Sequence, residues 1–133
     1  MKQAIGGFVF ALTCLTAQAQ STNLRADIPF EFRIGGTVLP PGSYTIQSSG
    51  SALIVREQRG SHVAVDFFTL AAMRPQALTT GQLVFNRYGN TYFLAKIWTP
   101  GSQDGREFRR SPQEKEAAGD SGRLSAAVAL RRQ

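Results

Sequence analysis

The sequence contains very little of the chemistry that metal sites and covalent catalysis require. Its 133 residues include one cysteine, Cys14, and one histidine, His62. Zinc sites need several cysteine or histidine ligands, and nucleophilic catalysis needs a serine or cysteine beside a base. On one strand His62 and Asp66 would stand about 13 Å apart, too far for a hydrogen bond. We therefore expect no catalytic residue, no metal site and no cofactor, and a protein that is not an enzyme.

Long apolar runs are also lacking after the first nineteen residues. Residues 5–15 are almost wholly apolar, follow a positive charge at Lys2 and precede a small-x-small pattern at residues 17–19. A bilayer crossing needs about 20 apolar residues, so this run is too short to be a membrane span. The pattern is typical of a secretory signal peptide, residues 1–19, cleaved between Ala19 and Gln20. We expect a secreted or periplasmic protein whose mature chain has no cysteine and no membrane span.

The charge of the chain is strongly positive. Fifteen lysines and arginines against nine carboxylates give a formal net charge of +6. The cations are spread along the chain, which a solvated basic surface explains without any partner. In an exported protein the anions available are lipids, cell-wall polymers and acidic glycans, so the composition argues against nucleic acid as a partner.

The clearest local structure is a hairpin over residues 82–100. Two runs rich in β-branched and aromatic residues flank Gly89 and Asn90, which tolerate the positive φ of a tight turn. A three-residue loop of Tyr88, Gly89 and Asn90 separates polar from apolar side chains better than a two-residue loop. In this register one face carries Leu83, Phe85, Phe93, Ala95 and Ile97, and the other carries Val84, Asn86, Tyr92, Leu94, Lys96 and Trp98.

The second face of this hairpin is the candidate recognition surface. Flat aromatic rings beside hydrogen-bond donors suit stacking on sugar faces and contacts with cations. The ligand-binding residues predicted on this basis are Asn86, Tyr92, Lys96 and Trp98. The alternative is packing, because a sheet with apolar side chains on both faces is usually covered on both.

A second hairpin is predicted between residues 53 and 68. A three-residue loop of Gln58, Arg59 and Gly60 would put glycine at the left-handed position of a type I turn with a G1 bulge. This register groups Leu53, Val55, Val63, Val65 and Phe67 on one face, with Arg56, His62, Ala64, Asp66 and Phe68 on the other.

The remaining strand signals lie nearer the amino terminus. Residues 24–34 alternate between apolar and polar, and Pro29 within them favours an edge strand or a bulge. A rigid turn at residues 40–42 leads into residues 43–48, with Tyr44 and Ile46 on one side. About seven strand-like segments between residues 24 and 99 predict an all-β fold. We expect a small antiparallel β-sandwich or partly open barrel, with a short C-terminal helix and a polar tail.

The predicted domain covers residues 20–100, and residues 101–133 are the polar tail. Within the tail, Ser111, Pro112 and Glu114 form a capping box that predicts a helix from about 112 to 118. Residues 124–132 carry a weak helical stripe and would be frayed unless they pack on the sheet. A chain ending at residue 110 should therefore keep its β structure.

Several segments resemble a pattern found in small exported β proteins of soil-type bacteria. The matching stretches are Ala-Asp-Ile-Pro-Phe-Glu-Phe at 26–32, Leu-Pro-Pro-Gly-Ser-Tyr-Thr-Ile at 39–46, residues 83–94 with Trp98, and Gly105, Arg106 and Glu107 followed by Ser111 and Glu114. Pro41 departs from the pattern, where a small residue is usual. The stretch 39–46 is also similar to the edge of transthyretin-like and carboxypeptidase-regulatory β-sandwiches. The resemblance implies export and a β fold, and it brings no activity, ligand or catalytic residue.

The sequence thus predicts an exported, non-catalytic β domain that serves as a binding module. Its partner would be a cell-envelope or extracellular ligand, either a glycan or a protein. The alternative is a structural or assembly component of the bacterial envelope.

Overall fold

The computed structural model describes residues 23–49, 52–66, 69–119 and 122–132. The predicted signal peptide, with its cleavage site between Ala19 and Gln20, lies outside these residues, as do Phe67 and Phe68. The described residues form an all-β fold with one short helix near the C-terminus, which confirms the predicted fold class. The sheet is nearly closed and resembles a barrel.

Eleven strands and one helix are present in the described part of the chain. In chain order they are β1 Leu24–Ile28, β2 Phe32–Ile34, β3 Thr37–Leu39, β4 Gly42–Ser49, β5 Ala52–Glu57, β6 Val63–Asp66, β7 Leu70–Met73, β8 Gly81–Tyr88, β9 Thr91–Trp98, β10 Asp104–Glu107, α1 Pro112–Ala118 and β11 Leu124–Arg132. The number of strands exceeds the predicted seven because residues 24–34 form two strands, residues 70–73 form a strand, and two more strands follow residue 100.

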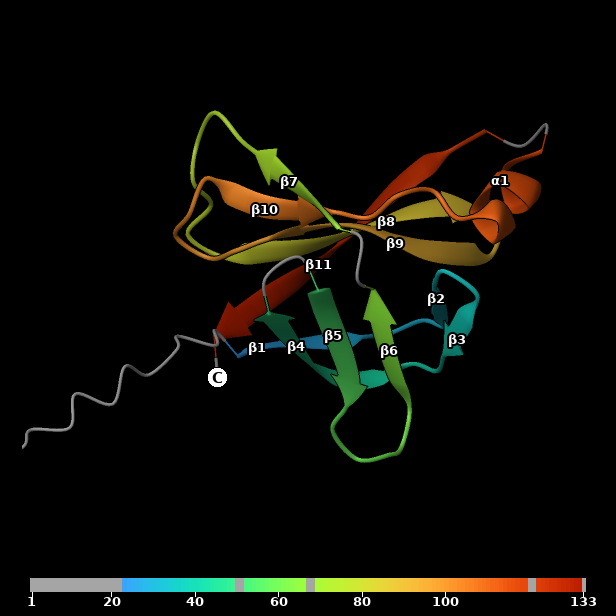
Figure 1. Cartoon of the computed structure of the whole chain (residues 1–133), viewed down its shortest axis with the longest axis horizontal. Coiled ribbons are helices and arrows are strands. Elements are labelled where there is room, and N and C mark those ends of the chain that lie inside the picture. The colour runs from blue at the N-terminus through green and yellow to red at the C-terminus, as the bar shows by residue number, and fades with distance from the viewer. Residues whose placement is uncertain (1–22, 50–51, 67–68, 120–121, 133) are drawn as a thin grey trace, which may run out of the picture.

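The strands form two facing layers (Figure 1). One layer contains β6, β5, β4 and β1, and the other contains β3, β2, β9 and β8. Strand β11 joins them, because it pairs with β8 over most of its length and with β1 at Arg131 and Arg132. Strand β10 pairs with the far end of β9 and also with β7, which extends the second layer.

Pro29 marks the point where the chain crosses between the layers. The predicted alternation holds across residues 24–34, since the apolar side chains at Leu24, Ile28 and Ile34 are all buried. The pairing changes at the proline: β1 lies beside β4, whereas β2 lies beside β9. Proline has no N–H to give to a ladder, so a break there leaves no donor unsatisfied.

Aromatic rings fill the space between the layers. Phe32 packs edge-on against Tyr44 and Phe85, with ring centroids 5.0 and 5.6 Å apart. Tyr44 and Ile46 are both buried on the same side of β4, as predicted. The Tyr44 hydroxyl donates a hydrogen bond to the carbonyl of Pro40. Burial, with a smaller contribution from the nearby Glu57 carboxylate, raises the pKa of Tyr44 to about 12.

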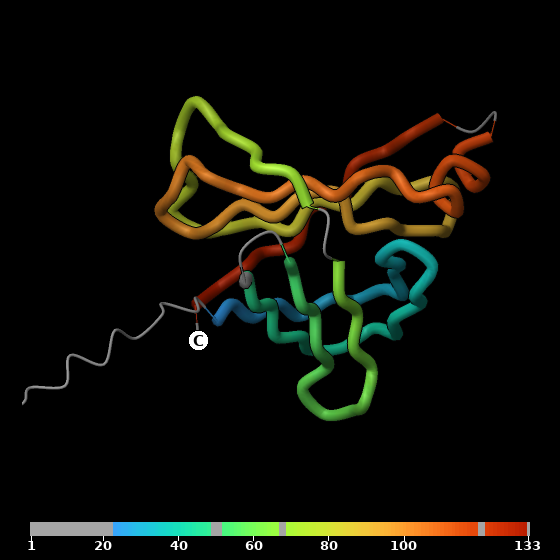
Figure 2. Tube along the Cα trace, viewed as in Figure 1, coloured from blue at the N-terminus to red at the C-terminus, as the bar shows by residue number. Residues whose placement is uncertain are grey.

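The residues beyond 100 differ from the expected polar tail. The helix lies where its capping box predicts, with the Glu114 N–H donating to Ser111 Oγ at 3.1 Å and Gly119 ending it. Residues 124–132, however, are strand β11 and not a frayed helix. Ala126, Val128 and Leu130 pack against the core at a spacing of two, and this period matches a strand. Figure 2 shows this last strand running from the β8 layer to the side of β1.

The β8–β9 turn is tighter than predicted. Tyr88 pairs with Thr91, so the loop contains only Gly89 and Asn90, with Gly89 at φ 61°. A β-bulge follows: Val84 pairs with Lys96 and Phe85 with Leu94, which leaves Ala95 as an extra residue of β9. A bulge of this kind shifts the alternation of faces by one position.

The predicted faces of β9 are wrong between the turn and the bulge and correct beyond the bulge. Between the turn and the bulge, Tyr92 and Leu94 face the core, and Phe93 lies on the outer face. Beyond the bulge, Ile97 is in the core and Lys96 is on the outer face, as predicted. The three-residue loop was predicted on the assumption that β9 has no bulge. With Ala95 as an extra residue, a two-residue turn is compatible with the burial of both Leu94 and Ile97 on the core face.

The predicted register of β5–β6 is wrong by one residue. Ala64 pairs with Val55 and is 3% exposed, whereas Val63 and Val65 are 41% and 43% exposed. The Glu57 N–H donates to the His62 carbonyl at 2.9 Å, so the loop has four residues rather than three. This longer loop exchanges the faces of β6, and the smallest of the three side chains points inward.

Candidate functional site

The outer face of β8 and β9 forms the floor of a hollow of about 350 Å³, here called the outer-face hollow. The strands β8, β9 and β11 and the segment after β10 supply its walls. Its lining residues are Val84, Asn86, Ala95, Lys96, Glu107, Phe108, Arg110, Arg123 and Ser125.

The sheet fixes the positions of the polar groups in the outer-face hollow. Asn86 pairs with Ser125 across β8 and β11, so their side chains share the outer face. Lys96 projects from β9 just after the bulge. The Phe108 N–H donates to the Ala95 carbonyl at 2.8 Å, which ties the segment after β10 to the bulged residue. The bulge therefore sets both the floor and one wall.

A buried carboxylate from α1 orients the adjoining side chains. Glu114 is 4% exposed, and its Oε1 accepts from Asn86 Nδ2 at 3.0 Å. Its Oε2 lies 3.4 Å from Arg110 Nε, and Arg110 Nη2 donates to the Tyr88 hydroxyl at 2.8 Å. The hydrogen bond with Tyr88, assisted by Glu114, raises the pKa of Arg110. A buried charge is tolerated when it is paired and hydrogen-bonded, as Glu114 is here.

Positive charge predominates in the outer-face hollow. Lys96, Arg110 and Arg123 line it, with Glu107 as the one carboxylate among the lining residues. Arg110 is paired with Glu114, but no ion pair within the described ranges involves Lys96 or Arg123. Two cationic groups are therefore available to a ligand.

The structure brings together two of the four predicted site residues, Asn86 and Lys96. Tyr92 lies on the inner face and stacks on Phe30, with centroids 3.8 Å apart. Trp98 is on the predicted face but only 8% exposed. The Arg74 guanidinium lies 5.0 Å from its ring centroid.

Strand β10 covers Trp98 at very close range. A Cβ placed on Gly105 would lie 2.5 Å from Trp98 Cε3, so only glycine fits over the ring. Trp98 is therefore packed under β10, as the alternative prediction proposed. The outer-face hollow is polar and has no exposed aromatic ring on which a sugar could stack.

Sequence reasoning missed the residues that complete the outer-face hollow. Glu107, Arg110, Arg123 and Ser125 all come from the region expected to be a polar tail. The capping box at Ser111 located the helix, but its pattern assigns the glutamate to the helix terminus rather than to a neighbouring strand. No spacing in the sequence places Arg123 beside β8.

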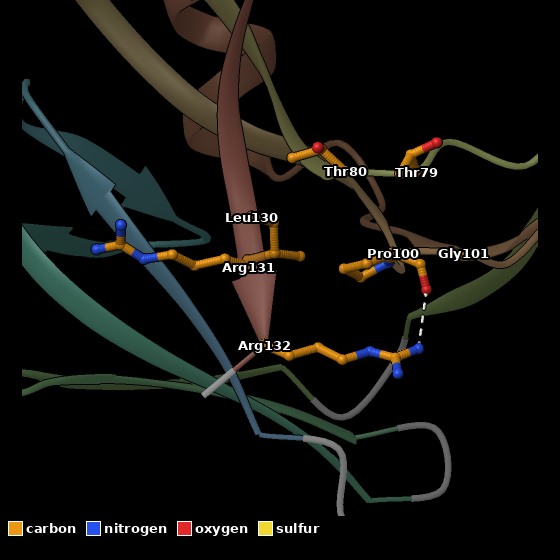
Figure 3. Close-up of a pocket in the computed structure, with 7 residues that line it drawn as sticks. All are labelled: Thr79, Thr80, Pro100, Gly101, Leu130, Arg131 and Arg132. Carbon is orange, nitrogen blue, oxygen red and sulfur yellow. Dashed lines mark hydrogen bonds between the residues drawn. The ribbon is translucent and has the colours of Figure 1, made fainter.

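A second hollow, of about 400 Å³, lies near the end of β11 (Figure 3). Leu130 and Pro100 contribute apolar surface, and Arg132 Nη2 donates to the Pro100 carbonyl at 3.1 Å. Arg131 points away from it in Figure 3 and forms an ion pair with Asp27 at 2.7 Å. Its cations are thus already bonded within the protein, unlike Lys96 and Arg123 in the outer-face hollow.

The lone histidine lies at the tip of the β5–β6 hairpin. His62 Nδ1 is 2.6 Å from Glu57 Oε2. Among the described residues, no three side chains of His, Cys, Asp or Glu gather closely enough to hold a metal ion. The one helix in that part of the chain is too short and polar to cross a membrane.

Comparison of the chain with protein families, curated proteins and solved structures finds no match.

Proposed function

We propose that the protein is an exported, non-catalytic β domain that binds a cell-envelope or extracellular glycan in the outer-face hollow. The observation that carries this proposal is the meeting of Asn86, Lys96 and Arg123 on a rigid sheet floor. Amide, ammonium and guanidinium groups are the hydrogen-bonding groups that a hydroxyl-rich sugar requires. The hollow also falls within the roughly 300–1,000 Å³ typical of ligand sites.

The chemistry of the lining supports binding over catalysis. Ser125 is the one hydroxyl residue in the lining, and neither a histidine nor a cysteine accompanies it there. Serine becomes a nucleophile only beside a base, and β8 separates Ser125 on β11 from Lys96 on β9 and Glu107 on β10. The buried Glu114 is occupied by Asn86 and Arg110.

Export rests on the pattern of residues 1–19. The expected mature protein begins at Gln20, and the intact mass of the exported species tests this. A mass that retains residues 1–19 would contradict the export proposal and leave the binding proposal to be tested separately.

Steric blocking tests the binding site directly. Ser125→Tyr would fill the outer-face hollow and should abolish retention of the protein on immobilised polysaccharides or insoluble peptidoglycan. Ala129→Tyr is the matched control, because Ala129 is exposed on the same face of β11 and does not line the hollow. Equal retention of both variants, with retention by the wild type, would place the binding site elsewhere.

One observation favours the alternative, a structural or assembly component of the envelope. Strand β7 pairs only with β10 within the described residues, and its apolar Leu70 and Met73 are 47% and 77% exposed. An unpaired strand edge can accept a strand from another protein. Met73→Lys would then abolish co-purification with one envelope protein, whereas glycan retention would be unchanged.

A further inference from the structure

The charges of the outer-face hollow bear on the class of glycan that it would bind. Arg110 is paired with Glu114, so Lys96 and Arg123 stand against Glu107 and leave an excess of one positive charge. Lys96 pairs with Glu107 in the backbone register of β9 and β10, yet no ion pair joins their side chains. The excess positive charge is thus not cancelled by the protein.

Two arginines in the described part of the chain have carboxylate partners. Arg131 is bonded to Asp27, which also accepts a hydrogen bond from Ser43. Arg110 is bonded to Glu114. Lys96 and Arg123 have none there, as is true of Arg56 and most other strand arginines, and they differ from these because both line one concave surface. A concave site in which cations outnumber carboxylates concentrates anionic ligands.

We infer that the ligand of the outer-face hollow is an anionic polysaccharide, whose charges are carboxylates or phosphodiesters. The inference rests on the proposed function. A neutral sugar would leave Lys96 and Arg123 unpaired, whereas an acidic unit would bond with both. The guanidinium fork of Arg123 matches the two oxygens of either acidic group. Asn86, held by Glu114, and Ser125 would contact the hydroxyl groups beside the charge.

Binding measurements on the purified protein test this at physiological salt. The probes are polygalacturonate for carboxylates, a phosphomannan for phosphodiesters, and dextran as a neutral polysaccharide. We expect at least one acidic polymer to bind and dextran not to bind. The acidic polymer that binds more tightly identifies the charged group.

Charge-removing variants locate the binding site on the surface. Lys96→Gln and Arg123→Gln should each weaken binding about five- to tenfold, as expected for a charged hydrogen bond that is partly exposed to solvent. Arg56→Gln removes the same charge from the exposed face of β5 and should change binding less than about twofold. Far-UV circular dichroism checks that all three variants fold.

The possible failures are distinguishable. Dextran binding as tight as that of the acidic polymers, with no effect of Lys96→Gln or Arg123→Gln, would overturn the acidic class and leave a neutral glycan in the hollow. Equal weakening by all three variants would overturn it in favour of a general basic surface. Binding to no polysaccharide or peptidoglycan at all would sink the proposed function itself.

Discussion

The hairpins β8–β9 and β5–β6 both consist of alternating apolar strands around a glycine-containing loop, yet they reach their registers differently. In β8–β9 a two-residue turn is followed by a bulge at Ala95, which restores the predicted faces beyond it. In β5–β6 the loop has four residues and the pairing continues without a shift, so β6 turns Val63 and Val65 outward.

The difference follows from the positions of the two hairpins in the sheet. β8–β9 is central, with β11 on one side and β2 and β10 on the other, and Phe93 and Trp98 are buried on its outer face. β6 pairs only with β5 in the described residues. A central hairpin must satisfy burial on both faces, and a bulge achieves this, whereas an edge hairpin can leave two valines in solvent.

The largest expected effect is on the central hairpin, from removal of β11. A chain ending at residue 119 would leave β8 and β1 without their shared partner and remove Leu130 from the core. The loss should exceed the roughly 5–15 kcal/mol of a typical domain, so the far-UV β signature should vanish. Leu124→Ser, at the exposed start of β11, is the control and should keep the spectrum. A cooperative unfolding transition in the shortened chain would show that the residues up to 119 fold without β11.

Insertion of one alanine after Ala95 should be the next most damaging change. If the bulge still takes up only one extra residue, the pairing set by the turn would carry Lys96 to the core face and Ile97 to the outer face. We expect more than about 4 kcal/mol of destabilisation, measured by chemical unfolding, because an unpaired lysine would be buried. Ala95→Gly keeps the residue count and should cost only about 0.5–1 kcal/mol. Similar losses in both variants would mean that the bulge does not set the register.

A pair of substitutions tests the register of the edge hairpin. Ala64→Val adds volume to the core and should cost about 1–3 kcal/mol. Val65→Ala removes an exposed side chain and should stay within about 0.5 kcal/mol. The opposite order in chemical unfolding would support the three-residue loop, in which Val65 faces the core.

The smallest expected effect is the pH dependence of Tyr44, which lies opposite Glu57 at the base of the edge hairpin. The pKa of Tyr44 is raised to about 12 from 10.0. Above pH 10 the unfolded chain therefore loses this proton before the folded chain does, and stability should decline between pH 10 and about 12. An absorbance titration should show one tyrosine ionising late, and Tyr44→Phe should remove that phase. Absence of a late phase that depends on Tyr44 would contradict the burial of this hydroxyl.

About half of the candidate site could be predicted from the sequence. Asn86 and Lys96 lie on one face because alternation within a strand is a local property, and the structure places both in the outer-face hollow. Arg123 and Ser125 could not be found, because β11 has too short an apolar pattern to be recognised without its neighbours. Trp98 was placed on the correct face, but its cover comes from Gly105 and Arg74, in β10 and just after β7.

The sequence by itself determined the buried positions of β1, β2 and β4 and the start and end of α1. These features depend on the period of apolar residues and on hydrogen bonds within a few residues, such as that between Ser111 and Glu114. Tertiary structure alone decided the registers of both hairpins, the strand conformation of residues 124–132 and the assembly of the outer-face hollow. The hairpin registers depend on which faces the rest of the fold buries, and the other two features require strands distant in the chain. Strand β11 forms because β8 and β1 offer it unpaired backbone groups that burial would otherwise leave unsatisfied.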